Sequence, residues 1–130
     1  MRYLSAEEIL VLHAFIINET SGSHGLRDVG LLQSIVHKPQ ASFAGKELYT
    51  DVFIKAAVLL EAIANYHVFI DGNKRTSFAS ATRFLYINGY EVIMTNEDVE
   101  NTIVKIATKE MVVSDIAVWL KKNSKKIKKI

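Results

Sequence analysis

Hydrophobic side chains recur every three or four positions along most of the chain, which is the period of an amphipathic helix. The first such run follows Ser5 and reaches Ile17, and a second run follows Asp28. Glu8 lies three residues after Ser5, and this pairing is a capping box that marks the start of a helix. The pattern predicts four further helices, which cover about residues 51–66 and 73–88 and then open at Thr95 and Ser114.

Glycine and proline residues interrupt the helical period between these runs. Two glycines shortly after residue 20 end the first helix, Pro39 stops the second, and Gly89 allows a left-handed end to the fourth. From residue 40 to residue 49 the helical period fades into QASFAGKELY, which predicts an extended, hairpin-like flap. Residues 90–94 are predicted to form a short extended piece.

The length and apolar content of the chain fit one folded unit. A chain of 130 residues, of which 49% are hydrophobic, has enough apolar material for a single core. We therefore predict an all-α fold, a compact bundle of about six helices with a small β-hairpin-like flap. The single domain is expected to span residues 1–122, followed by a basic C-terminal tail at residues 123–130.

Composition and charge exclude several classes of protein. Cysteine is absent, which excludes disulfides and thiolate metal sites, and no apolar run approaches the roughly 18 residues of a membrane span. We expect a soluble, cytoplasmic protein. The formal charge is +2, and much of the positive excess lies in the final KKNSKKIKKI, which leaves a slightly acidic body that argues against a DNA-binding face. We expect this tail to be a frayed, solubilising helix end, with nucleic acid or an acidic partner as alternative contacts.

The polar stretch HVFIDGNKRT separates the two most apolar predicted helices and carries the candidate chemistry. A glycine turn that feeds a helix leaves the first N–H groups of that helix without intrahelical partners, at the positive end of the helix dipole. Such a helix start binds anions, phosphate above all. Gly72 opens the backbone to a ligand, and Asn73, Lys74 and Arg75 place an amide and two cations around the same point.

His67 and Asp71 add acid–base and metal chemistry to this phosphate site. A carboxylate beside phosphates is the usual protein ligand of Mg²⁺, which assigns Asp71 to a metal. The ordinary pKa of histidine, about 6.5, suits a general base that takes a proton from a hydroxyl, which assigns His67 to catalysis. Phe69 is expected to anchor the loop in the core. Each polar residue also has a structural alternative, such as a helix cap for Asp71 or Asn73.

HVFIDGNKRT also resembles the signature loop of the Fic/Doc family: His, any residue, Phe, any residue, Asp or Glu, Gly, Asn, Gly or Lys, Arg. The chain matches every fixed position of that loop. The segments MRYLSAEEILVLH and GLRDVGLLQSIV and the flap are similar to the death-on-curing (Doc) branch, so the resemblance covers nearly the whole domain. It implies a catalytic histidine, His67, and a Mg²⁺ ligand, Asp71. It also implies a set of ATP-binding residues, namely Gly72, Asn73, Lys74 and Arg75. Asp71 and Arg75 serve catalysis as well.

Two positions decide which Fic/Doc reaction the resemblance implies. Adenylylating members usually have glycine where this chain has Lys74, and many have a second arginine where it has Phe78. Lysine is typical of the Doc branch, whose members move the terminal phosphate of ATP onto a threonine of elongation factor Tu and block translation. The resemblance therefore implies an ATP-dependent protein phosphotransferase that acts as a toxin. Transfer of AMP to a hydroxyl is the alternative.

The resemblance also implies two protein partners. In Fic-type enzymes the flap receives a segment of the target protein as an added strand, which assigns target docking to Ser42, Phe43, Lys46 and Leu48. The chain lacks the self-inhibiting string of some family members, so we expect inhibition by a separate antitoxin that covers the active groove. Two further interpretations stay open. One is a non-catalytic binding module, and the other is a metal hydrolase, for which the histidines show too few ligands at a suitable spacing.

Overall fold

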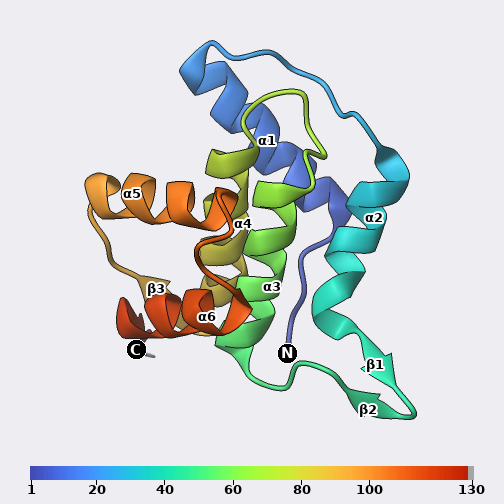
Figure 1. Cartoon of the computed structure of the whole chain (residues 1–130), viewed down its shortest axis with the longest axis vertical. Coiled ribbons are helices and arrows are strands. Elements are labelled where there is room, and N and C mark those ends of the chain that lie inside the picture. Colours follow the sequence, from blue (N-terminus) through green and yellow to red (C-terminus); the bar gives the residue numbers. More distant parts are fainter. Residues whose placement is uncertain (129–130) are drawn as a thin grey trace.

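The computed structural model describes residues 1–128 and is built mainly from helices (Figure 1). The predicted all-α fold with a small hairpin is confirmed. Six α-helices and one short 3₁₀ helix form the described part, namely α1 (Ala6–Thr20), α2 (Val29–His37), η1 (Lys38–Gln40), α3 (Val52–Asn65), α4 (Asn73–Ile87), α5 (Asn96–Ala107) and α6 (Val113–Lys122). Two antiparallel strand pairs complete it, namely β1 (Ser42–Phe43) with β2 (Lys46–Glu47) and β3 (Tyr90–Val92) with β4 (Ser124–Lys126).

Most helices start where a polar side chain caps the first turn. The Ser5 hydroxyl accepts a hydrogen bond from the backbone N–H of Glu8, and the Glu8 carboxylate accepts one from the N–H of Ser5, as predicted. The predicted cap at Ser114 is wrong. Helix α6 begins at Val113, and the Asp115 carboxylate accepts a hydrogen bond from the N–H of Val112 instead, so Ser114 lies inside the first turn.

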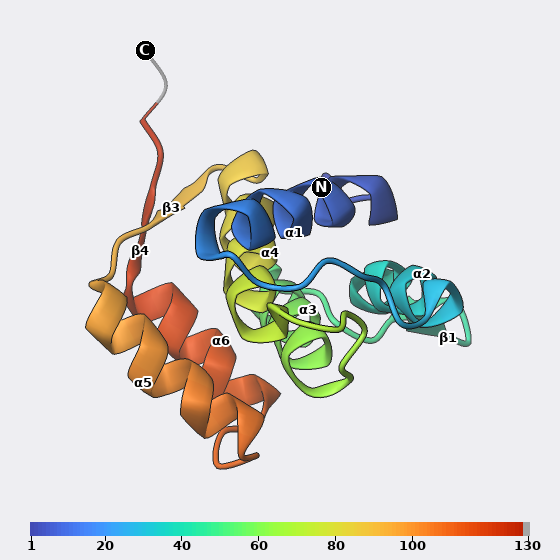
Figure 2. The same ribbon diagram turned by 90° about the horizontal axis from the view of Figure 1, so that it is seen from above.

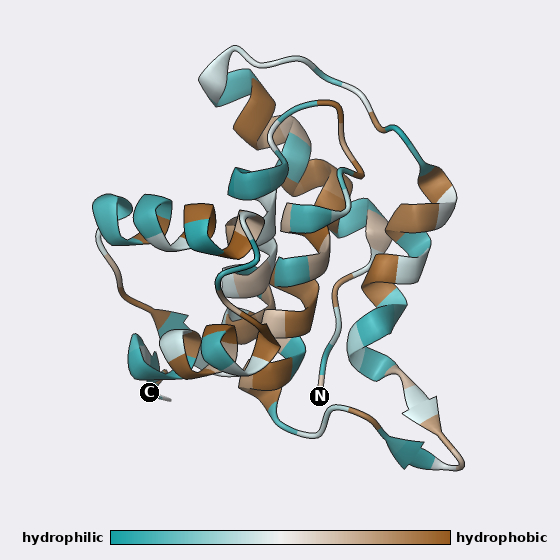
Figure 3. Cartoon of the chain, in the orientation of Figure 1, coloured by the Kyte–Doolittle hydropathy of each residue, from teal (hydrophilic) through white to brown (hydrophobic). Residues whose placement is uncertain are grey.

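Helix α3 forms the centre of the core, with α4 and α6 packed against it. Ten of its 14 residues are buried, because neighbouring elements cover it on more than one side. Figure 3 shows hydrophobic colours along α3 and hydrophilic ones on strand β2 and at the start of α5. Helices α3 and α4 are antiparallel neighbours, so the turn between them lies at one end of the bundle (Figure 1).

A buried lysine ties the β1–β2 hairpin to the first turn of α3. Lys55 is 1% exposed, and its Nζ donates hydrogen bonds to the Pro39 carbonyl at 2.7 Å and to a Glu47 carboxylate oxygen at 3.2 Å. The ammonium also lies 5.4 Å from the centroid of the Tyr3 ring, a cation–π distance. A buried charge of this kind is tolerated because each of these groups compensates it.

Lys55→Met is expected to lower the free energy of unfolding by about 1–3 kcal/mol, because the buried Pro39 carbonyl loses its donor. Glu47→Gln is the matched control, since the Glu47 side chain is 55% exposed and its ion pair is screened by water. We expect that control to cost less than about 1 kcal/mol. Urea unfolding curves measure both values, and an equal loss in the two variants would contradict the buried role of Lys55.

The basic tail does not form the frayed helix end that we expected from the sequence. Ser124–Lys126 form strand β4, which pairs in antiparallel register with Tyr90–Val92 (Figure 2). The backbone N–H of Ile127 continues the pairing by donating to the Gly89 carbonyl at 2.9 Å. The tail up to this point is therefore ordered by backbone pairing, while its last two residues lie outside the described part. The division of the chain at residue 122 stays a prediction.

The longest helices of residues 1–128 are α1 and α4, with 15 residues each. A membrane span needs about 20 apolar residues. None of the described helices is long and apolar enough to cross a bilayer.

Candidate active site

The turn from α3 to α4 holds its histidine in a left-handed backbone conformation. His67 has a φ of +52°, and its side chain is exposed. A non-glycine residue rarely adopts this conformation, although histidine, asparagine and aspartate tolerate it better than most. The His67 imidazole has no hydrogen-bond partner among the described residues, so it is accessible to an incoming ligand.

Helix α4 begins directly after this turn without a side-chain cap from residues 1–128. Gly72 occupies the N-cap with a φ of +79°, a conformation that favours glycine. Side-chain caps are present at the starts of α1, α2, α3 and α5. The first N–H groups of α4 therefore remain available at the positive end of the helix dipole, which is the arrangement of an anion site.

The Asp71 carboxylate lies at the edge of this helix start and is held by two backbone N–H groups. One oxygen accepts from Gly72 at 2.9 Å, and the other accepts from Ser23 at 3.1 Å. A carboxylate offers about four acceptor positions, so both oxygens keep capacity for another partner. Asp71 is exposed, which gives a ligand access to those positions.

This carboxylate fits Mg²⁺ but not a metal held by protein alone. The described residues contain no group of three or more histidine, aspartate or glutamate side chains that could hold a metal ion. Mg²⁺ is usually bound by one or two carboxylates together with substrate phosphates. Asp71 supplies one carboxylate, and the start of α4 beside it is suited to a phosphate. A metal at Asp71 would therefore be shared with a phosphate. The alternative interpretation as a metal hydrolase gains no ligand set from the described residues.

Asn73 uses its side chain to close the loop. Its amide oxygen accepts from the backbone N–H of Phe69 at 3.0 Å, and its amide nitrogen donates to the Phe69 carbonyl at 2.9 Å. Phe69 is 1% exposed, so the predicted anchor of the loop in the core is confirmed. Asn73 thus fixes the backbone between His67 and the helix start, while its predicted phosphate contact stays a prediction.

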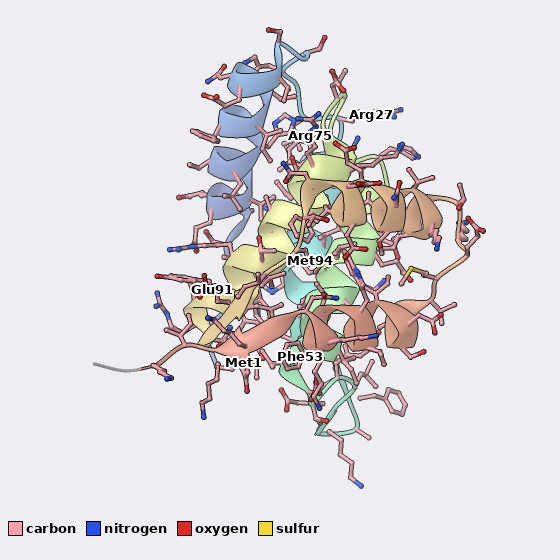
Figure 4. All side chains as sticks on the ribbon, turned by 90° about the vertical axis from the view of Figure 1, so that its left-hand side faces the viewer. Met1, Arg27, Phe53, Arg75, Glu91 and Met94 are labelled. Carbon is pink, nitrogen blue, oxygen red and sulfur yellow. The ribbon has the colours of Figure 1, made fainter. Side chains whose placement is uncertain are left out.

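The start of the segment GLRDVGLLQSIV, to which the sequence analysis gave no role in the site, supports the same loop. The N–H of Arg27 donates to the Val68 carbonyl at 2.8 Å, and the N–H of Ile70 donates to the Gly25 carbonyl at 3.1 Å. These bonds make an antiparallel bridge between the segment that precedes α2 and the loop that follows α3. Figure 4 shows Arg27 and Arg75 at the same end of the molecule, away from Phe53 near the start of α3. In the sequence, this region was marked only by its glycines and by the similarity of GLRDVGLLQSIV to the Doc branch.

The loop residues surround one surface depression of about 460 Å³. The structure brings together all six predicted catalytic, metal and cofactor residues there, with Lys74 and Arg75 exposed. The lining consists of Thr20, Gly22, Ala64, His67, Ile70, Asp71, Gly72, Asn73, Lys74 and Arg75. A nucleotide-sized ligand would therefore meet the imidazole, the carboxylate and the cations in one place.

The predicted target-docking flap is not part of this depression. Lys55 binds the β1–β2 hairpin to the first turn of α3, whereas His67 follows the last turn of that helix. A helix of 14 residues is about 21 Å long. The hairpin residues assigned to target docking are exposed but lie at the far end of α3 from the loop that follows it, namely Ser42, Phe43, Lys46 and Leu48 (Figure 1).

Lys38 contacts the end of α3 immediately before the loop that carries His67. Its Nζ donates to the Tyr66 hydroxyl at 2.7 Å. Partial burial lowers the pKa of Lys38, but the hydrogen bond to Tyr66 and nearby negative groups such as Glu61 outweigh it, so the net pKa is raised above its ordinary value. Lys38 therefore stays protonated near neutral pH and keeps this contact.

Comparisons with known proteins agree with this geometry. The model of the Fic/DOC family matches residues 3–85. The chain is 36% identical to a protein of Mycolicibacterium smegmatis named Toxin Doc, over 91% of this chain and 90% of the relative. It is 39% identical to a protein of Escherichia phage P1 named Protein kinase doc, over 94% of this chain and 95% of the relative.

Proposed function

The chain belongs to the Fic/DOC family, and we propose that it is the toxin of a toxin–antitoxin pair that transfers the terminal phosphate of ATP to a protein hydroxyl. The proposed acceptor is a serine or threonine of a translation factor, and elongation factor Tu is the first candidate. Two relatives support the proposal by their names, since one is named a toxin and the other a protein kinase. The expected consequence of the transfer is a block of protein synthesis.

One observation carries the reaction: the uncapped start of α4, the Asp71 carboxylate and the exposed His67 imidazole line the same depression. Phosphoryl transfer needs little covalent help from a protein, because positioning and charge stabilisation supply most of the rate. Free backbone N–H groups and the cations of Lys74 and Arg75 stabilise the charge of the phosphate oxygens. Asp71 is the residue that would hold Mg²⁺, which would supply further positive charge to offset that of the phosphates.

His67 acts on the acceptor side of the reaction. The acceptor oxygen attacks the terminal phosphorus, the bond from that phosphorus to the leaving ADP breaks, and the hydroxyl proton passes to the imidazole. The left-handed backbone at residue 67 and the anchoring of Phe69 together fix the point from which the imidazole reaches out. Such general base catalysis depends on a position within hydrogen-bond reach of the hydroxyl.

Lys74 is the reason to favour phosphate transfer over AMP transfer. Its side chain is exposed beside the helix start, where it adds bulk and charge that a glycine would leave out. A lysine at this point supports a pose in which the terminal phosphate, rather than the α-phosphate, faces the acceptor. AMP transfer by the same His67, Asp71 and Arg75 is the second candidate.

Labelled ATP separates these two reactions. Incubation of the protein with a host lysate and ATP labelled in the γ-phosphate is expected to label a protein band, whereas ATP labelled in the α-phosphate leaves that band unlabelled. Intact-mass analysis of the modified protein is expected to show a gain of about 80 Da for phosphate, against about 329 Da for AMP. Transfer of the α-label would overturn phosphate transfer in favour of AMP transfer, and transfer of neither label would overturn both.

The proposed antitoxin is a separate protein that inhibits the toxin by covering the active groove. The proposal rests on the relative named as a toxin and on the exposure of the catalytic loop in this chain. Expression of the chain alone is expected to stop growth of a bacterial host, and normal growth with soluble, folded protein would contradict a free, active toxin.

A further inference from the structure

His13, a buried residue of α1, contacts the backbone of the catalytic loop. It is 4% exposed, and its Nε2 lies 2.8 Å from the Asp71 carbonyl oxygen. A carbonyl oxygen only accepts hydrogen bonds, so Nε2 must carry the hydrogen in this contact. The two residues are 58 positions apart in the sequence. Helix α1 thus holds the backbone of the residue whose carboxylate faces the proposed metal.

The same imidazole also lies against one loop residue on each side of Asp71, Phe69 and Gly72. Its ring stacks on Phe69 with a centroid distance of 3.8 Å and an interplanar angle of 7°. A Cβ added at Gly72 would lie 3.7 Å from the ring, so the ring also lies next to the N-cap of α4. His13 therefore contacts the loop before, at and after Asp71.

A turn after α1 holds the other side of Asp71. The N–H of Ser23 donates to one carboxylate oxygen, and Gly22 passes close to the same oxygen. A Cβ added at Gly22 would lie 2.8 Å from that oxygen and 3.0 Å from the Ile17 side chain. A side chain at residue 22 would therefore fit only if the Asp71 carboxylate or the end of the Ile17 side chain shifted.

We propose that His13 and the turn Gly22–Ser23 are positioning residues that fix the direction of the Asp71 carboxylate for a metal-bound nucleotide. The inference rests on the proposed function, since it names what keeps the proposed Mg²⁺ ligand in place. His13 contacts the backbone carbonyl of Asp71, and Ser23 binds one of its carboxylate oxygens. Because these contacts already hold Asp71, its carboxylate does not have to be ordered when the metal binds. Residues that orient a metal ligand are often as important for metal affinity as the ligand itself.

The first test replaces Gly22 by alanine and compares it with Gly30→Ala. Both glycines adopt backbone conformations open to alanine, but a Cβ at Gly30 meets its nearest atom, an Asp28 carboxylate oxygen, at an ordinary 3.5 Å. Calorimetric titration with ATP, in Mg²⁺ and in EDTA, measures nucleotide binding without any need for transfer. In Mg²⁺ we expect Gly22→Ala to bind ATP about tenfold more weakly than the parent, whereas Gly30→Ala binds like the parent.

The EDTA arm separates a positioning role from a general loss of structure. Gly22→Ala is expected to bind metal-free ATP as the parent does and to keep its melting temperature. Unchanged binding in Mg²⁺ would overturn the inference while leaving the proposed function intact, as would an equal loss with and without the metal. A parent protein that binds no ATP under either condition would overturn the proposed function, and the inference with it.

The second test separates the hydrogen bond of His13 from its packing. His13→Gln keeps a side-chain N–H that can reach the Asp71 carbonyl, and His13→Phe keeps the flat ring on Phe69 without a donor. We expect His13→Gln to need about the parental Mg²⁺ concentration for half-maximal transfer, and His13→Phe to need about tenfold more, with a similar rate at saturating Mg²⁺. Equal Mg²⁺ dependence in the parent and His13→Phe would overturn the role of the hydrogen bond.

Discussion

His67→Asn is expected to lower the rate of phosphate transfer by about 10²–10⁴-fold, which is the usual contribution of a general base. Asparagine is the suitable replacement because it tolerates the left-handed backbone that residue 67 adopts. The imidazole is exposed and has no hydrogen-bond partner within residues 1–128, so its loss removes no packing. We therefore expect the folded state to survive, with a change in the free energy of unfolding within about 0.5 kcal/mol.

Single-turnover transfer from γ-labelled ATP measures this loss, and growth of a host that expresses the variant gives a second readout. His37→Asn is the matched control, because His37 is also exposed but lies at the end of α2, outside the depression. The control is expected to transfer phosphate and stop growth like the parent. A His67→Asn variant as toxic and as active as the control would favour a binding module that acts without catalysis.

The elements that the sequence predicted well are those whose signals are local. Helix starts at Ser5, Asp28 and Asp51 follow from side chains within three residues of the N–H groups that they cap. The polar loop was found for the same reason, since its residues are consecutive and the helices on both sides are apolar. A local pattern requires no knowledge of which segments meet in space.

The features that the sequence missed depend on contacts between distant segments. Strand β4 pairs with residues 90–92, and nothing in its run of lysines indicates extended backbone, because the strand is stabilised by its partner. The contact of His13 with Asp71 is equally non-local, so no pattern in the residues around His13 indicates it. The position of the flap relative to His67 likewise depends on the length and direction of α3.

Phe69→Ala is expected to lower the free energy of unfolding by about 3–5 kcal/mol, the usual cost of removing a buried aromatic side chain. Phe69 is 1% exposed and stacks on His13, so the substitution leaves a cavity between the loop and α1. A domain of this size is stable by about 5–15 kcal/mol, and the variant would lose a large part of that. Urea unfolding measures the loss, and Phe43→Ala on the hairpin, where Phe43 is 77% exposed, is the control.

The same substitution also tests whether the loop is held mainly by its buried side chain or by its backbone bonds. Asn73 binds the N–H and carbonyl of residue 69, and these two bonds do not need the phenyl ring. If the ring dominates, hydrogen exchange at Ile70 and Gly72 is expected to accelerate in Phe69→Ala far more than exchange at the centre of α3. Unchanged exchange in the loop together with a small loss of stability would show that the backbone bonds suffice. The left-handed turn at His67 would then be held without its aromatic anchor.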